Sequence, residues 1–314
     1  MQYVIGCSMP QQQFAQFCRL LVSDPAPYFA TDQARSQLPW DLLWLSRAEY
    51  ATAARMDERD SFQIYAVQPE ATHVALIGAA EVRSMPRTQR QHLHRLQWQL
   101  GRSHVYDRSV IAPLLAADEH RWVDQITVAT DDGDKVVLDY DVWRSLSDES
   151  RWRWLQYYVS LDRAVCRSRI MDDQDWQRIE QQHGPIIREL AGSFAWHSGP
   201  NCFATTLAAA TRNVERARSI ATLWLHGAPF LRELAARGYR HNPLVSVEAD
   251  LPSGAVVVWV DQRGTPQHSC FVVERGLALN KDAQAWYAPR QILPLHTVRE
   301  QWQDDHLMAH VYLR

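Results

Sequence analysis

The sequence lacks an excess of charge of either sign. Its 33 Lys and Arg residues nearly balance 36 Asp and Glu residues, and the formal net charge is -3. This balance creates no strong electrostatic field that would attract nucleic acid or anionic lipid. We therefore expect no nucleic-acid partner and no membrane partner.

An export signal and a long apolar run are also missing. The first ten residues contain no basic residue ahead of an apolar stretch and no small-residue cleavage site, unlike a secretory signal. No apolar run reaches the roughly 18 residues that a membrane-spanning helix needs. These absences favour a cytoplasmic location.

Paired cysteines are absent as well. The five cysteines are an odd number, are scattered, and include no Cys-x-x-Cys pair. They are Cys7, Cys18, Cys166, Cys202 and Cys270. Their arrangement argues against a disulfide framework and a zinc cluster. We expect free thiols, no metal and no cofactor.

Two other segments contain metal-ligand residue types. His92 and His94 are two apart in a helical pattern and so do not share a helix face, which favours a solvated surface over a metal site. The stretch 131–134 reads Asp-Asp-Gly-Asp, but no glutamate follows at calcium-loop spacing, so a hairpin turn explains it.

The length of 314 residues favours two domains. There is no internal repeat and no low-complexity linker, so the boundary is placed at Gly192, where a helix can end on a left-handed residue. We expect a mixed α/β domain over residues 1–190, which offers a surface for a protein partner, and a second domain over residues 191–314.

Apolar spacing in the first 190 residues indicates alternating helices and strands. Strands are expected at 3–6, 61–67 and 73–82, and a hairpin at 122–140 with its turn at 131–134. Helices are expected to begin at Pro10 and Pro86, to include the aromatic stretch 152–158, and to span 173–191. We expect this half to form one wall of the cleft above the second domain, because pockets commonly form at domain junctions.

The strongest functional signal begins at Cys202. A turn over 198–201 precedes it, and the Ala-rich stretch 203–211 after it predicts a helix. A cysteine in the first turn of a helix lies near unpaired backbone N–H groups, which stabilise the reactive thiolate and can bind an oxyanion. Taken alone, Cys202 also fits a buried core cysteine.

The downstream strands supply a base and an orienting residue. Alternation predicts strands at 255–260, 267–273 and 277–282, with His268 opening the second and Asn280 in the third. A three-residue turn over 274–276 places residue 270 opposite residue 280, so His268 and Asn280 become diagonal neighbours on one face, roughly 7 Å apart. A two-residue turn would place them on opposite faces.

This C-terminal stretch resembles the NlpC/P60 and CHAP branch of the papain-like cysteine hydrolases. The matching features are the helix-start Cys202, the Leu-Pro-x-Gly-x-Val-Val segment 251–257, the strand-start His268 and the polar Asn280. The resemblance implies an α+β fold, in which a papain-like helix packs on an antiparallel sheet after the mixed N-terminal domain. It also implies a catalytic triad of Cys202, His268 and Asn280 that acts on an amide bond in a peptide or amide substrate.

In such a triad a thiolate attacks a carbonyl, the imidazole protonates the leaving amine, and the amide orients the imidazole. We expect the sulfur of Cys202 within roughly 4 Å of a ring nitrogen of His268. His296 and Asp282 are alternatives for the base and the orienter, and His197 or Ser198 for an oxyanion donor. The leading functional hypothesis is a thiol amidohydrolase or peptidase. The alternatives are a thiol acyltransferase or deamidase and a non-catalytic binding module.

Overall fold

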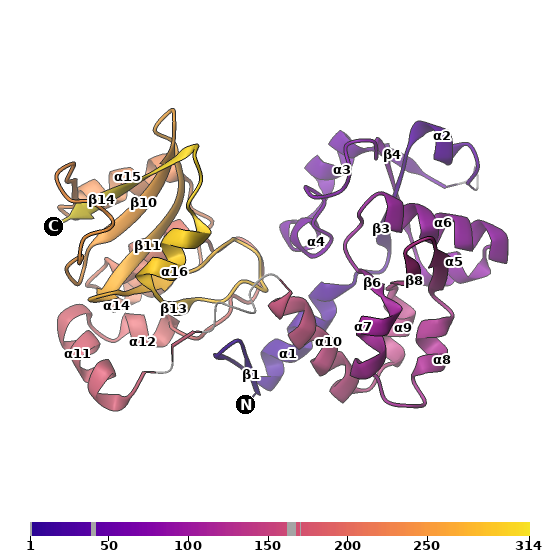
Figure 1. Cartoon of the computed structure of the whole chain (residues 1–314), viewed down its shortest axis with the longest axis horizontal. Coiled ribbons are helices and arrows are strands. Elements are labelled where there is room, and N and C mark those ends of the chain that lie inside the picture. The colour runs from indigo at the N-terminus through magenta and orange to yellow at the C-terminus, as the bar shows by residue number, and fades with distance from the viewer. Residues whose placement is uncertain (1, 39–41, 162–167, 170) are drawn as a thin grey trace. The chain divides into compact units, whose positions relative to one another are not determined.

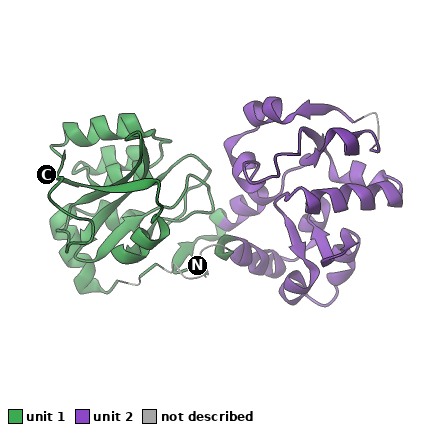
Figure 2. Cartoon of the chain, turned by 45° about the horizontal axis from the view of Figure 1, so that its top comes forward, with its two compact units in different colours: residues 1–13, 159–314 green, residues 14–158 purple. Residues whose placement is uncertain are grey.

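The computed structural model describes residues 2–38, 42–161, 168–169 and 171–314 (Figure 1). The chain forms two compact units, which Figure 2 shows in different colours. Unit 1 comprises Met1–Gln13 and Val159–Arg314, and unit 2 comprises Phe14–Tyr158. Both combine helices with antiparallel sheets, so the fold is α+β. Within these described ranges no helix is long and apolar enough to span a bilayer.

Unit 2 contains two described sheets of three strands. Their strand orders are β3-β5-β4, formed by Ala26–Ala30, His73–Ile77 and Trp44–Ser46, and β6-β8-β7, formed by Val105–Asp107, Gly133–Val137 and Thr127–Thr130. The helices around them are α2 Asp32–Arg35, α3 Arg47–Ala53, α4 Met56–Ser61, α5 Ala79–Ser84, α6 Arg87–Gln99, α7 Arg108–Ile111, the 3₁₀ helix η1 Ala112–Leu114, α8 His120–Asp124, α9 Tyr140–Ser145 and α10 Asp148–Ser160. Helix α1, Gln11–Leu21, starts in unit 1 and continues into unit 2.

Several predictions for unit 2 are confirmed and others are wrong. Helix α6 begins directly after Pro86, and its apolar face is buried as its spacing predicts. The predicted strand at 61–67 is instead the end of α4 followed by turns. The strand predicted at 73–82 ends at Ile77, and helix α5 begins at Ala79. Short apolar runs fit a buried helix as well as a strand, so periodicity could not separate them.

Unit 1 is built on a six-stranded antiparallel sheet. Its strand order is β13-β12-β11-β10-β14-β9, formed by Gln291–Pro294, Leu277–Asn280, Pro266–Glu274, Val256–Asp261, Leu307–Leu313 and Arg240–His241. A separate ribbon pairs β1 Gln2–Val4 with β2 Cys7–Met9. The helices are α11 Asp173–His183, α12 Ile186–Leu190, α13 Cys202–Ala209, α14 Val214–Ile220, α15 Gly227–Ala236 and α16 Leu295–Gln301.

The central strands of unit 1 are buried on both faces. Val256, Val258 and Phe271 belong to one apolar cluster, together with residues of α11 to α15. Val257 and Val272 belong to a second cluster, together with residues of α16. Because side chains alternate along a strand, each face of the sheet has its own core. The face with α13 is called the α13 face below, and the other the α16 face.

The β11–β12 hairpin has the predicted strand register, but its turn is shorter than predicted. Its turn contains only Arg275 and Gly276, because Glu274 pairs with Leu277. A bulge between Val272 and Glu274 then adds one residue, so that Val272 pairs with Ala278. The predicted three-residue turn is therefore wrong, but the bulge restores the parity that it was meant to supply.

The boundary between the units lies near residue 158, not at the predicted 190. Helices α11 and α12 belong to unit 1 because Ile179, Ile186 and Ile187 are buried in the α13-face core. The ribbon at the N-terminus also belongs to unit 1, where the Ser8 N–H donates to the carbonyl of Gly192 over 2.8 Å. Unit 1 is thus assembled from two separate segments of the chain, which no local sequence signal marked.

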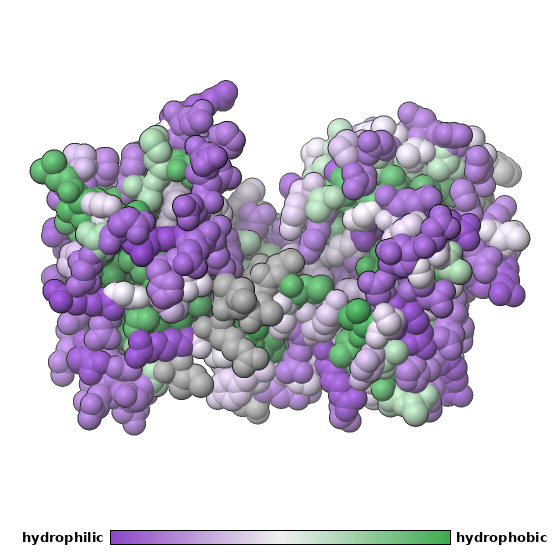
Figure 3. Space-filling view, viewed as in Figure 1, coloured by the Kyte–Doolittle hydropathy of each residue, from purple (hydrophilic) through white to green (hydrophobic). Residues whose placement is uncertain are grey.

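The face shown in Figure 3 is mainly hydrophilic. Its apolar residues form small separate patches on the described surface of both units. Scattered exposed apolar residues of this kind are normal for folded proteins and indicate no binding site by themselves.

Candidate active site

Cys202 is the first residue of α13, as the sequence predicts. Asn201 caps this helix: its side-chain oxygen accepts from the Ala204 N–H over 3.1 Å, and its side-chain nitrogen donates to the carbonyl of Leu225 over 2.7 Å. The cap leaves the backbone N–H groups of Cys202 and Phe203 close to the sulfur, where both lower the pKa of the thiol. The local geometry of a nucleophile at a helix N-terminus is therefore present.

Burial outweighs the effect of this helix N-terminus. The Cys202 side chain is 6% exposed, and burial raises the pKa of its thiol to about 12. The N–H groups of Ser269, Phe203 and Cys202 and the charge of Lys281 act in the opposite direction without cancelling that cost. The expectation of a stabilised thiolate is thus not met: the resting state at neutral pH is a thiol.

His268 and Asn280 form the predicted pair. Nε2 of His268 lies 2.8 Å from Oδ1 of Asn280, and both side chains are buried. Asn280 Nδ2 donates to Asp282 Oδ1 over 2.7 Å, and only the amide nitrogen can donate to a carboxylate. Asp282 thereby directs Oδ1 toward His268, so the proton is on Nε2 and the lone pair is on Nδ1.

The free lone pair of His268 has no partner in the structure. Nδ1 is buried and makes no hydrogen bond within the described residues. Burial lowers the pKa of His268 to about 4, while Asp282 and Asn280 act to raise it. The ring is therefore neutral at pH 7 and has an available proton acceptor.

The predicted hydrogen bond between Cys202 and His268 is not formed in this structure. His268 lies on the α16 face with Cys270 and Val272, whereas Ser269 faces α13 and donates to Thr206 Oγ1 over 2.9 Å. Strand alternation therefore places the imidazole on the face opposite α13. The expectation that Cys202 and His268 meet on one face is wrong for this conformation.

The thiol nevertheless lies next to His268 along the chain of β11. Its sulfur interacts with the backbone N–H of Ser269, the residue that follows His268. Val272 N–H points to β10, where it donates to Ala255, so the N–H of Ser269 points to the β12 side. The described β11–β12 ladder ends at the pair Phe271 and Leu279. The sulfur thus lies on the β12 side of β11, beyond the last described pair of the β11–β12 ladder, and it is buried there.

Two tryptophans that the sequence analysis did not select hold the imidazole. The Trp302 ring stacks on His268 with centroids 4.0 Å apart and an interplanar angle of 5°, and the Trp259 ring lies 5.4 Å away. Trp302 directly follows α16 and therefore comes from outside the hairpin. The 13 tryptophans of the chain gave no signal that singled out this one.

Lys281 is a second residue that the sequence analysis missed. Its side chain is fully buried, and Nζ donates to the carbonyls of Ala283, Ala285 and Ala288 at 2.6–3.0 Å. These bonds fold the segment after β12 around a buried cation. The charge also favours the thiolate of Cys202, so Lys281 links the structure of this segment to the thiol.

The segment 222–227 borders both the start of α13 and the start of β11. The carbonyl of Leu225 accepts from Asn201, next to Cys202. A Cβ at Gly227 would meet Pro266 at 3.0 Å, and Pro266 is two residues before His268. Leu223 and Trp224, which directly precede Leu225, are each 48% exposed. Two exposed apolar side chains therefore directly precede the residue that contacts Asn201, the neighbour of Cys202.

The alternative residues have other surroundings. Ser198 is buried, and its hydroxyl accepts from the Trp286 N–H over 3.2 Å, which ties two loops together. His197 contacts the carbonyl of Ser198 through Nδ1. His296 is exposed on α16, and Asp282 contacts Asn280 in place of the imidazole.

The remaining cysteines and histidines do not gather into a metal site in the described parts of the chain, where no cluster of three or more His, Cys, Asp or Glu side chains occurs. Cys7, Cys18 and Cys270 are buried free thiols. Cys166 lies outside the described residues.

Comparison with protein-family models, curated proteins and solved structures finds no match for this chain.

Proposed function

We propose that unit 1 is a papain-like cysteine hydrolase domain that cleaves an amide bond with Cys202 as nucleophile, His268 as base and Asn280 as orienting residue. The observation that carries the proposal is the His268–Asn280–Asp282 chain, which leaves an unpaired Nδ1 lone pair buried beside the strand position that contacts the thiol. A buried acceptor without a partner costs free energy. His94 and His104 also have an unpaired buried ring nitrogen, so the feature that distinguishes His268 is the thiol beside the next residue of its strand.

The pKa directions favour general-base catalysis from a neutral pair. With the pKa of Cys202 raised and that of His268 lowered, thiol and imidazole are both uncharged at pH 7. As sulfur attacks the carbonyl carbon, the C–S bond forms and the thiol proton moves to Nδ1 of His268. The imidazolium then gives that proton to the leaving amine as the C–N bond breaks, and water hydrolyses the thioester.

The backbone at the start of α13 fits the remaining part of this reaction. The N–H groups of Cys202 and Phe203 face the region of the sulfur and can donate to the oxyanion that develops on the carbonyl. Substrate entry must bring Nδ1 and the sulfur into hydrogen-bond contact, because the two do not meet in the resting structure. Because the imidazole and α13 lie on opposite faces of the sheet, this contact requires a rearrangement at the start of β11 that turns the ring toward the sulfur.

The exposed side chains of segment 222–227 indicate the type of substrate. Leu223 and Trp224 offer exposed apolar area next to Leu225, which contacts Asn201, so the group next to the scissile amide is expected to be apolar. An amine in place of water would convert the same acyl-enzyme to acyl transfer.

A second candidate is a binding module without catalysis. The burial of Cys202 and the missing contact with His268 favour it. The two candidates differ in whether His268 changes the reactivity of Cys202.

Thiol labelling tests this difference. The full chain is treated with iodoacetamide at pH 7, and each cysteine is quantified by peptide mass spectrometry. If the imidazole reaches the sulfur in solution, as the proposed mechanism requires, it accepts the thiol proton and increases thiolate formation. We then expect Cys202 to react at least about tenfold faster than Cys270, and His268→Ala to remove this advantage. His268→Gln, with circular dichroism as the folding check, provides a variant of similar size. Equal labelling of Cys202 in wild type and both variants would support the binding module.

Turnover of a panel of peptide amides with apolar residues gives the second test. Cys202→Ala and His268→Ala should each lower turnover by about 10³-fold or more, and the double variant should lose little more, because these residues act as a unit. Asn280→Ala should leave partial activity. Additive losses in the double variant would contradict the proposed triad.

A further inference from the structure

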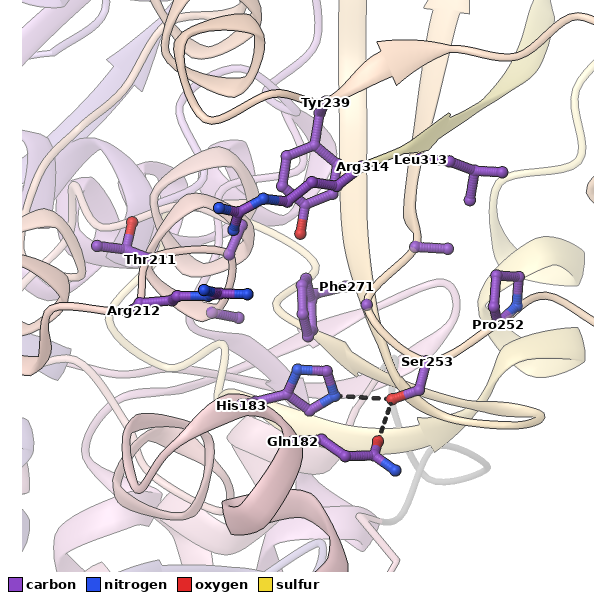
Figure 4. A pocket seen from close by; sticks show the side chains of 14 residues that line it. Gln182, His183, Thr211, Arg212, Tyr239, Pro252, Ser253, Phe271, Leu313 and Arg314 are labelled. Carbon is purple, nitrogen blue, oxygen red and sulfur yellow. Dashed lines mark hydrogen bonds between the residues drawn. The ribbon is translucent and has the colours of Figure 1, made fainter.

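A pocket in unit 1 lies away from the candidate active site. It has a volume of about 430 Å³ and is lined from α11, the end of α13, the turn before β10 and the last residues of the chain (Figure 4). Ala209 and Ala210 line it at the C-terminal end of α13, whereas Cys202 is at the N-terminal end. At 1.5 Å per residue the two ends are about 10 Å apart. The pocket is therefore a separate site.

Positive charge dominates the lining. Arg212 and Arg314 both line the pocket, and no aspartate or glutamate does. In Figure 4 their guanidinium groups lie on the same side of the pocket, beside Phe271. No ion pair to either group occurs among the described residues. The nearby Glu233 pairs instead with Arg216 and Arg237. Two exposed like charges thus line one pocket without an Asp or Glu side chain, and a bound anion would reduce their mutual repulsion.

Tyr239 adds an independent observation. Its side chain is 4% exposed, and its hydroxyl points into the pocket (Figure 4). The hydroxyl makes no hydrogen bond within the described part of the chain. Burial raises the pKa of Tyr239, and the charges of Arg314, Arg212 and Arg237 oppose that rise. The group is therefore a neutral donor directed at the space that the arginines surround.

The opposite wall is neutral and already hydrogen-bonded. Ser253 Oγ lies 2.7 Å from His183 Nε2 and 2.7 Å from Gln182 Oε1. Burial lowers the pKa of His183, so this wall contributes no positive charge at pH 7. The C-terminal carbonyls of α13 contribute roughly half a negative charge, which two full guanidinium charges exceed. Phe271 and Pro252 also line the pocket and provide apolar contact area, with Phe271 between the arginines and Ser253 (Figure 4).

We propose that this pocket binds a small organic anion through a phosphate or carboxylate group. Arg212 and Arg314 pair with the anionic oxygens, and the Tyr239 hydroxyl donates to one of them. Guanidinium groups suit such planar or tetrahedral oxyanions because they donate two parallel hydrogen bonds. The apolar part of the ligand packs against Phe271 and Pro252. The volume fits a molecule of small-metabolite size.

Calorimetric titration of the full chain tests the site with three probes: inorganic phosphate, phenyl phosphate and benzoate. We expect saturable 1:1 binding, with phenyl phosphate tighter than inorganic phosphate because only the former contacts Phe271. The relative affinities for phenyl phosphate and benzoate show whether the site prefers a phosphate or a carboxylate group. Sodium chloride at matched ionic strength corrects for general screening.

Three variants and a matched control locate the binding. Arg212→Gln and Arg314→Gln should each weaken binding about tenfold or more, and Tyr239→Phe should weaken it a few-fold. Arg263→Gln removes an equally exposed guanidinium from the β10–β11 turn and should leave affinity unchanged. The proposal is overturned if no probe saturates by about 10 mM, a Kd that corresponds to only about 3 kcal/mol, or if Arg263→Gln weakens binding as much as Arg212→Gln. Since Cys202 is not involved, this outcome is independent of the proposed hydrolase activity.

Discussion

Unit 1 and unit 2 both bury histidines, but in different surroundings. In unit 2, His94 and His104 are buried near Arg102, and burial followed by that charge lowers the pKa of each to about 3. In unit 1, His268 has an oriented acceptor in Asn280 and a thiol near the following residue. A buried histidine is therefore not evidence of a site by itself. His104 also has an ordered partner, the Tyr106 hydroxyl at 2.9 Å from Nδ1, so the nearby thiol is what distinguishes His268.

Arg102 shows why the unit 2 cluster has a structural explanation. Its guanidinium is buried over the rings of Tyr28 and Phe62 at 4.8 and 4.9 Å, and its Nε donates to the carbonyl of Pro27. These contacts join β3 to the segment after α6 and compensate part of the cost of burying the charge. In unit 2 the buried guanidinium holds elements together, and although His94 and His104 also have an unpaired ring nitrogen, neither lies beside a contact to a thiol such as that of Cys202.

The largest expected effect concerns the boundary between the units. A fragment of residues 191–314 lacks the buried side chains of α11 and α12, which are Ile179, Ile186, Ile187 and Leu190. At about 1.5–3 kcal/mol for each, the loss is about 10 kcal/mol, as large as the stability of a typical domain. We expect this fragment to be unfolded by circular dichroism, while 159–314 unfolds cooperatively. A folded 191–314 would restore the boundary that the sequence predicted.

The buried histidines of both units also make the folding stability depend on pH. A histidine with a lowered folded-state pKa binds its proton more readily when unfolded, so stability is complete above the ordinary value of 6.5 and falls as pH drops. For His268 this loss ends near pH 4 and amounts to about 3 kcal/mol. For His104 it continues to about pH 3.

Replacement of each histidine isolates its contribution. His268→Gln and His104→Gln should each flatten the slope of unfolding free energy against pH by up to about 1.4 kcal/mol per pH unit within these windows. Urea unfolding at steps between pH 3 and pH 7 measures the slope. An unchanged slope for His268→Gln would mean that its ring is not shielded from water as described.

Loss of the stacked tryptophan should have a smaller effect. Trp302→Ala removes the ring that covers His268, so we expect about 2 kcal/mol lower stability and a pKa of His268 that rises toward its ordinary value. A histidine NMR titration measures the shift, and Trp302→Phe should retain most of the shielding. If the pKa stays unchanged in Trp302→Ala, the burial of His268 does not depend on this ring.

The smallest expected effect concerns Asp282. Asp282→Asn removes a negative charge that raises the pKa of His268, so that pKa should fall further. It also frees the Asn280 amide to rotate, which should slow labelling of Cys202 a few-fold, or about 1 kcal/mol. Asp250→Asn, which alters an exposed ion pair with Arg275, is the control. Identical labelling in both variants would exclude an orienting contribution from Asp282.

The sequence by itself determined the local features of the candidate site. A turn followed by an Ala-rich run placed Cys202 in the first turn of a helix, because helix starts depend on neighbouring residues. Alternation of apolar residues located β10, β11 and β12 to within two residues. The His268–Asn280 pairing followed from an even separation, although the bulge that preserved it had no sequence signal.

Tertiary structure decided what depends on residues distant in the sequence. Trp302 reaches His268 from beyond the hairpin, and Lys281 is buried by the segment that folds around it. The raised pKa of Cys202 reflects burial by the whole core of unit 1, and the α13 and α16 faces separate its helix from the His268 ring. The burial of a side chain, and the sheet face against which a helix packs, depend on which elements come together in the fold. The spacing of residues along the sequence does not determine this.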